Sequence, residues 1–383
     1  MNENNSTDNR GWELYNERSK EIIQNKTEVV KSNFLSHTRS IKDILQLPPA
    51  ERPEVEITCI DERAVISVRD NEGNLDIVHI NTPGGGTEFL EDEDIEQIIM
   101  LSNGNIKINS HLFCGWGEYI FNQILDGDES NEDNLGNKST GITRIMNSIR
   151  LALDDPKDVF WQSYLKEFEE KGLGKTDLLN KARIYVSKVA HRQNLDDQDN
   201  MIKDLVLQAF VHGKTIKLAT RFEQIHEKLI NDYNELKLMN GENENLTEPP
   251  QLDKRLNIVT YIDTLQNAPH QHIADSAIIN MTRDRVFTSR FPVEGKDAFF
   301  ARVGFKKSNP LIDLIFKIME GDHSDSKELD HNIYVCCDEA DKDPIESLIK
   351  GIAEVNSSRK IIVIGLSEEE LNGQHDPLPP SVH

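Results

Sequence analysis

The sequence is poor in cysteine and has no long hydrophobic run, and each shortage excludes a class of protein. Four cysteines in 383 residues are too few for a disulfide-stabilised scaffold of this size. No apolar run approaches the roughly 20 residues that a membrane-spanning helix needs. The first ten residues are polar and contain no apolar core, so no signal peptide is expected. Together these shortages favour a protein of the reducing cytoplasm.

Positive charge is also scarce. The chain has 43 lysines and arginines against 67 aspartates and glutamates, which gives a net charge of -24 and a pI near 4.9. This balance argues against binding to nucleic acid or to an anionic membrane surface. The apolar content of 37% is enough for ordinary cores, and the length allows two or three domains of roughly 100–200 residues each.

Breaks in the hydrophobic pattern divide the chain into four predicted parts. Residues 1–47 form an N-terminal helical arm, in which Trp12–Leu45 is one long helix or two, ended by a double proline. Residues 48–239 are typical of an α/β domain with a mostly parallel central sheet flanked by helices, and with a short strand at Thr215–Thr220. Residues 240–251 are a polar linker. Residues 252–383 form a smaller α/β domain whose layout weakly echoes the first, as a decayed duplication would.

Two cysteines and one histidine stand at the ends of two predicted strands. Cys59 ends an apolar alternation that begins at Val55, and His111 and Cys114 follow the short run Ile106–Ile108. Ligands of α/β sheets gather at the carboxyl ends of the strands. A Cys, His and Cys set supplies three zinc ligands and leaves one tetrahedral position open for water. We therefore predict a Zn²⁺ site here, although a single cysteine on a strand is more often a small buried hydrophobe.

The residues around these ligands form two short motifs, Cys59-x-Asp61-x-Arg63 and His111-x-x-Cys114-Gly115. Paired in this order, the motifs resemble those of the β-class carbonic anhydrases. The resemblance covers about residues 41–229, where the stretch from Gly213 to Leu218 looks like that family's edge strand after a pair of late helices.

The resemblance implies a function and a set of partners. It implies zinc held by Cys59, His111 and Cys114, with Asp61 and Arg63 as a paired gate beside the open position. It also implies reversible hydration of carbon dioxide to bicarbonate as the reaction. Family members usually pair domains or subunits across a two-fold axis, so a homo-oligomer or an internal pseudo-dimer is expected.

The chemistry of the residues agrees with this gate. Asp61 follows Cys59 by two residues on the predicted strand, so it can accept a hydrogen bond from the attacking water and orient its lone pair. Asp61 could instead ligate zinc and displace the water, which would be a resting state. Arg63 can hold Asp61 through two hydrogen bonds and keep it ionised. The alternative interpretation is an ordinary ion pair at a strand end.

A run of three glycines, residues 84–86, replaces the Asn-Ala-Gly segment of the resembled family. Backbone N–H groups at Gly85, Gly86 and Gly115 would bind an anion such as bicarbonate. A phosphate cradle and a plain tight turn are the alternatives. Because Ile60 and Trp116 also depart from the family's pattern, two other functions stay open. One is a hydrolase of carbon disulfide or carbonyl sulfide, and the other is a catalytically silent, zinc-stabilised assembly module.

Overall fold

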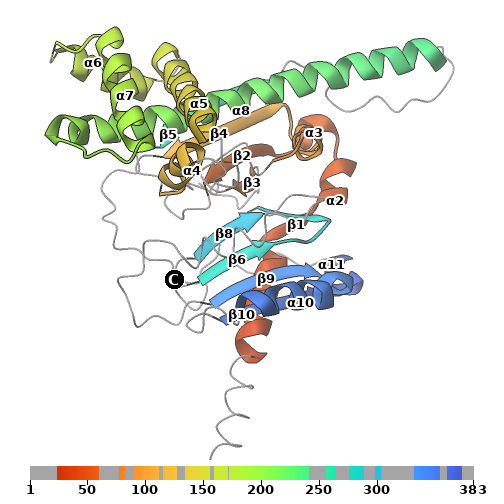
Figure 1. The fold of residues 1–383 in the computed structure, drawn as a ribbon. Coiled ribbons are helices and arrows are strands. Elements are labelled where there is room, and N and C mark those ends of the chain that lie inside the picture. The colour runs from red at the N-terminus through yellow and green to blue at the C-terminus, as the bar shows by residue number, and fades with distance from the viewer. Residues whose placement is uncertain are drawn as a thin grey trace, which may run out of the picture.

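The computed structural model combines helices with two β-sheets, so the predicted α/β class is correct. Figure 1 shows a layer of helices on one side of a six-stranded sheet and a four-stranded sheet on its other side. The structure describes residues 24–59, 77–82, 90–111, 115–126, 134–155, 159–170, 172–240, 256–263, 276–288, 298–302, 332–353 and 360–372.

The six-stranded sheet has the order β1-β7-β3-β2-β4-β5. Its parallel strands are β2 (Glu54–Cys59), β3 (Ile77–Thr82), β4 (Asn105–His111) and β5 (Asn257–Asp263). The short strands β1 (Thr38–Ser40) and β7 (Arg285–Phe287) pair antiparallel at the other edge. The central sheet is therefore mostly parallel, with an antiparallel ribbon on one side.

The helical layer covers one face of this sheet. It contains α3 (Asp92–Leu101), α4 (Gly115–Asp126), α5 (Asn134–Asp154), α6 (Val159–Glu170), α7 (Lys175–Ala190) and the 44-residue α8 (Asp197–Asn240). Ile57 of β2 and Ile108 of β4 pack against α3 and against Leu218 and Phe222 of α8. The first half of α8 packs with α4, α5 and α7 in a second apolar core. One helix therefore spans both cores, as Figure 1 shows.

The predicted strand at Thr215–Thr220 is wrong, because these residues lie in the middle of α8. The alternation of Lys with Ile and Leu suggested a strand, and Gly213 suggested a helix end. Gly213 instead lets two helices cross closely, since a Cβ there would lie 1.9 Å from the backbone oxygen of Ser148 on α5. The part of the family resemblance that needed an edge strand at Gly213–Leu218 is therefore wrong as well.

The four-stranded sheet is parallel throughout and has the order β10-β9-β6-β8. Its strands are β6 (Ser276–Asn280), β8 (Ala298–Arg302), β9 (Asn332–Asp338) and β10 (Lys360–Leu366). Helix α10 (Lys342–Ala353) connects β9 to β10, and α11 (Glu368–Asn372) follows β10. The helical residues 24–36 pack on it through Phe34, which contacts the core around Tyr334. Within the predicted arm, β1 separates this helix from α2 (Ile41–Gln46).

The sheets do not divide where the polar linker predicted a boundary. β5 and β7 both follow residues 240–251, yet both belong to the six-stranded sheet. A polar segment marks where a chain leaves a helix, and it carries no information about the sheet edge to which the chain returns. In chain order, the parallel strands of both sheets are arranged second, first, third, fourth. Many doubly wound sheets share this order, and the duplication stays a prediction.

Candidate functional site

The strands that carry two of the predicted zinc ligands are neighbours. Cys59 is the last residue of β2 and His111 is the last residue of β4. The two strands pair in parallel, with Ile57 opposite Ile108, so their carboxyl ends meet at one edge of the sheet. α4 begins at Gly115, directly after the third predicted ligand. The backbone thus places the strand ends that carry Cys59 and His111 next to each other.

The side chains of this predicted site lie outside the described residues. Asp61, Arg63, Gly85, Gly86 and Cys114 belong to segments that the structure does not describe, and only the backbone of Cys59, His111 and Gly115 is described. In the described part of the chain, no group of three or more His, Cys, Asp and Glu side chains could hold a metal ion. The zinc site and the gate therefore stay predictions.

A second feature of the same strands was not foreseen. Polar side chains of β2, β3 and β4 alternate with the apolar residues that pack in the core shared with α8. They therefore lie on the opposite face of the sheet, which is turned toward the four-stranded sheet (Figure 1), where β3 contacts β8. Five of them are buried: Glu56 is 4% exposed, Thr58 0%, His79 1%, Asn81 0% and Asn109 1%. Lys107, which pairs with Glu56 in the register of β2 and β4, is 39% exposed and binds Glu54 at 2.6 Å. An alternating strand predicts that its polar face meets solvent, so the alternation does not indicate that these residues are enclosed.

The strand register arranges these side chains in two rows. His79 pairs directly with Glu56, and Asn81 with Thr58. The β2–β4 register, continued by one residue, places Asn109 on the other side of Thr58. We call these the inner row (His79 and Glu56) and the outer row (Asn81, Thr58 and Asn109). The outer row lies next to the strand ends that carry Cys59 and His111.

The outer row contains a hydrogen bond, and the inner row a close approach of an imidazole to a carboxylate. The Asn81 amide Nδ2 donates to Thr58 Oγ1 at 2.8 Å, and His79 Nδ1 lies 3.4 Å from Glu56 Oε2. Burying polar groups costs free energy even when they are paired, and a parallel sheet covered on both faces is usually apolar on both. The inner row is a buried acid–base pair about 10 Å along β2 from Cys59, at roughly 3.3 Å per residue. Folding alone does not require such a pair.

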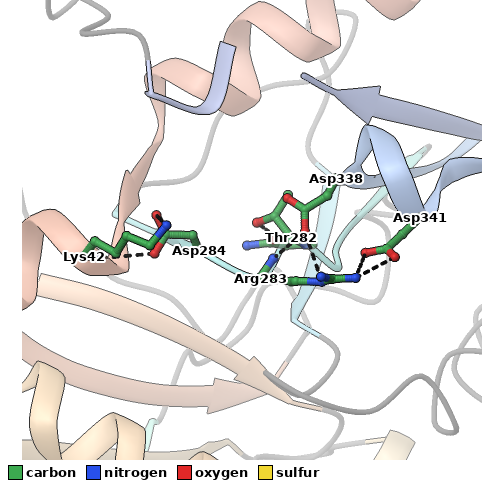
Figure 2. Close-up of polar contacts among 7 residues, drawn as sticks. Lys42, Thr282, Arg283, Asp284, Asp338 and Asp341 are labelled. Carbon is green, nitrogen blue, oxygen red and sulfur yellow. Dashed lines mark hydrogen bonds and ion pairs between the residues drawn. The ribbon is translucent and has the colours of Figure 1, made fainter. Parts of the chain in front are cut away.

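The carboxyl end of the four-stranded sheet also gathers polar side chains, but these bind one another (Figure 2). Arg283 follows β6, and its Nη2 donates to both carboxylate oxygens of Asp341, at 2.7 and 2.9 Å. The Arg283 backbone N–H donates to Asp338 at 3.2 Å. Asp284 accepts a hydrogen bond from the backbone of Lys42 at 3.1 Å and so holds the start of α2. This edge therefore works as a structural junction.

The two cysteines of β9 are unsuited to metal binding or nucleophilic chemistry. Cys336 and Cys337 are both fully buried. Burial, together with the nearby carboxylates of Asp341 and Asp338, raises the pKa of the Cys337 thiol to about 12. Burial likewise raises the pKa of Cys336. Because the thiolate is the form that binds metals and attacks electrophiles, neither side chain competes with the predicted site.

Two further findings bear on function. Comparisons with protein-family models, with curated proteins and with solved structures find no match to this chain. Across the described residues, no helix combines the length and the apolar character that crossing a membrane demands.

Proposed function

We propose that this chain is a zinc enzyme of the β-carbonic-anhydrase type, which reversibly hydrates carbon dioxide to bicarbonate. The observation that carries the proposal is the position of the two ligand-bearing strands. Cys59 and His111 end adjacent parallel strands, and strand ends of this kind are where α/β proteins hold their ligands. A coincidence of motifs in the sequence does not require the two segments to be neighbours.

The predicted donor set fits a zinc ion. Cys59, His111 and Cys114 would hold it, since two thiolates and one imidazole are ordinary zinc ligands. When bound, zinc supplies a Lewis acid that lowers the pKa of water to about 7 and so provides a nucleophile at neutral pH. Asp61 would accept a hydrogen bond from the attacking water and orient it.

The remaining predicted residues would complete the site. Arg63 would hold the Asp61 carboxylate in place and keep it ionised. Backbone N–H groups at Gly85, Gly86 and Gly115 would bind the product anion. The net charge of -24 supports a cytoplasmic protein that works on a small molecule, without nucleic acid as a partner. Pairing into a homo-oligomer, or of the two sheets as a pseudo-dimer, belongs to the same proposal.

The metal part of the proposal is tested by the zinc content of purified protein. Wild type is expected to hold about one zinc ion per chain, and Cys114→Ser almost none, because one of three protein ligands is lost. Cys337→Ala is the matched control, since its thiol is buried in β9 and should leave the zinc content unchanged. Equal zinc in Cys114→Ser and wild type would show that this cysteine is not a ligand.

The catalytic part is tested by stopped-flow hydration of carbon dioxide. Wild type should accelerate hydration, and Asp61→Ala should retain zinc while losing most of that activity. A zinc-loaded wild type that hydrolyses only carbonyl sulfide or carbon disulfide would move the assignment to a related hydrolase. Zinc without turnover of any of these substrates would indicate a silent, zinc-stabilised module, and the enzyme assignment would be wrong.

A further inference from the structure

Strand β5 is an edge of the six-stranded sheet, and its outer side pairs with no other strand of the described chain. Its inner side pairs with β4 over all seven residues, from Asn257 to Asp263. Ile258 packs against the core that contains Leu218 of α8, while the next residue, Val259, is 44% exposed. β4 and α8 therefore hold this strand in place and leave its outer edge for another partner.

The hydrogen bonds to β4 determine which backbone groups of β5 point outward. The Asn257 N–H donates to the backbone oxygen of Gly104 at 2.8 Å, so this group points toward β4. Backbone N–H and C=O groups point to alternate sides of a strand from one residue to the next. The outward groups therefore belong to Ile258, Thr260 and Ile262. They form a row of donors and acceptors that can bind another strand.

Natural sheets protect such an edge with lysine, proline, a bulge or a very short strand. β5 pairs with β4 without a bulge, its sequence is Asn-Ile-Val-Thr-Tyr-Ile-Asp, and its one charge is at the last position. The opposite edge of the same sheet, β1, has three residues and includes Arg39. At β10, the seven-residue edge of the other sheet, the side chains of Glu339 and Lys342 lie against Gly365. Among the described edge strands, β5 is therefore the long one with the least protection.

We propose that the outer edge of β5 binds the same edge of a second copy of this chain, in antiparallel orientation around a two-fold axis. The strand runs from residue 257 to residue 263, so Thr260 is its midpoint. Full overlap of two antiparallel copies pairs each midpoint with itself. Because Thr260 is also an outward residue, this overlap makes the central pair a hydrogen-bonded one.

The residue order of β5 fits this pairing. The register places the following residues opposite each other across the two copies: Ile258 and Ile262, Val259 and Tyr261, Thr260 and Thr260, Asn257 and Asp263. Pairs of β-branched and aromatic residues stabilise a sheet, whereas like charges directly opposite destabilise it. Each Asp263 falls opposite Asn257, so the one charge of the strand meets no like charge. Parallel pairing in the same register would place the two copies of Asp263 opposite each other.

The charge of the chain also favours this edge as the contact between copies. At a net charge of -24, two copies repel each other, so they are expected to meet where the chain carries little charge. The proposal gives an interface to the homo-oligomer that belongs to the proposed function. It rests on the geometry of β5, however, and the predicted zinc site does not enter the argument.

The test is the mass of the full-length protein in solution, measured by analytical ultracentrifugation over about 1–100 μM. Wild type is expected at twice the chain mass of 43.7 kDa. Thr260→Pro removes an outward N–H and keeps the bonds to β4, a position at which an edge strand accepts proline. It should fold, and its dimer dissociation constant should rise at least about tenfold.

Two lysine variants complete this comparison. Thr260→Lys is a second disrupting variant, since it places like charges opposite each other at the axis. It also decides the question if Thr260→Pro does not fold. Thr220→Lys is the matched control, because Thr220 is exposed on α8 and the dimer should persist. A wild type that stays monomeric throughout, or a dimer that Thr260→Pro and Thr260→Lys leave unchanged, would overturn the proposal.

The register is tested by mild oxidation of single-cysteine variants, with wild type as the reference. Hydrogen-bonded antiparallel partners have Cα atoms about 5.5 Å apart, a distance that a disulfide spans. Thr260→Cys should therefore form a disulfide-linked dimer, and Ile258→Cys should not, because it lies opposite residue 262 of the second copy. Equal cross-linking of the two variants would overturn the pairing. Zinc content measured on the same samples separates this inference from the proposed function: a dimer that lacks zinc would overturn only the function, and a zinc-loaded monomer only the interface.

Discussion

The two sheets bury their strands in opposite ways. In β9, at the centre of the four-stranded sheet, the five residues from Ile333 to Cys337 are all buried, and none carries a charge. In β2, at the centre of the six-stranded sheet, Val55 and Ile57 alternate with Glu56 and Thr58, and these four are buried as well. A parallel sheet covered on both faces normally resembles β9. The fold therefore does not require the buried polar side chains on this face of β2, β3 and β4.

The carboxyl ends of the strands also differ between the two sheets in what their polar side chains bind. At the end of the four-stranded sheet, Arg283 binds Asp338 and Asp341, and Asp284 holds α2. Those polar groups serve one another and the junction between elements. In the six-stranded sheet, the inner and outer rows run toward the strand ends that carry Cys59 and His111. The comparison assigns a structural role to one end and the proposed chemistry to the other.

The sharpest test of this comparison is to make the inner row apolar. His79→Leu should lower the free energy of unfolding by roughly 3 kcal/mol, because Glu56 loses the imidazole beside it while remaining buried. The double variant Glu56→Leu/His79→Leu should recover most of that loss, since it makes β2 and β3 resemble β9. Urea denaturation measures both. If His79→Leu is as stable as wild type, the pair of Glu56 and His79 does not contribute to the free energy of unfolding.

The second test takes the equivalent step in the four-stranded sheet. Asn280→Ala removes a donor to the backbone oxygen of Arg285, at 2.9 Å, and the acceptor for the N–H and hydroxyl of Thr282, at 3.0 and 2.8 Å. The free energy of unfolding should fall by about 2 kcal/mol, since several buried hydrogen bonds are lost together. Zinc content should stay at the wild-type level. Loss of zinc would break the separation of roles between the two sheets.

The sequence predicts the strands that carry these residues, but it does not predict that their polar side chains are buried. The β9 residues Ile333–Cys337 form a continuous apolar run, which is typical of a buried parallel strand. The strands β2 and β4 were also predicted, from their alternation. The burial of their polar residues was not, because Glu56 and His79 read as a solvent-facing side until a second sheet is known to cover them. Whether a second sheet covers a strand face depends on the tertiary structure, and the periodicity of the sequence does not indicate it.

The misread stretch of α8 has a related cause. Residues 215–220 alternate like a strand, and the crossing of α8 with α5 at Gly213 decides for helix. Likewise, nothing local indicates that the chain returns through β5 to the first sheet. The proposed zinc ligands are a different case, since ligand spacing is a local signal. The adjacency of β2 and β4 agrees with it.

A matched pair of threonines tests the comparison more finely. Thr58→Val removes the acceptor for the Asn81 amide in the six-stranded sheet. Thr282→Val removes a donor to Asn280, whose oxygen keeps the Thr282 N–H. We expect a cost of about 1.5 kcal/mol for Thr58→Val and about 0.5–1 kcal/mol for Thr282→Val. Equal costs in urea denaturation would show that the outer row is held no more tightly than the structural junction.

The smallest effect is expected at the exposed ion pair of that junction. The Arg283 side chain is 70% exposed, so water screens its attraction to Asp341. Arg283→Ala should therefore change the free energy of unfolding by less than about 1 kcal/mol, and 0.5 M sodium chloride should reduce the difference further. Lys42→Ala is the control, because Lys42 Nζ lies 3.9 Å from Asp284 and is equally exposed. If Arg283→Ala instead costs several kcal/mol and the cost persists in salt, Arg283 takes part in an interaction that is shielded from solvent. In that case the contrast between the two carboxyl ends would no longer hold, because both would then be candidate sites.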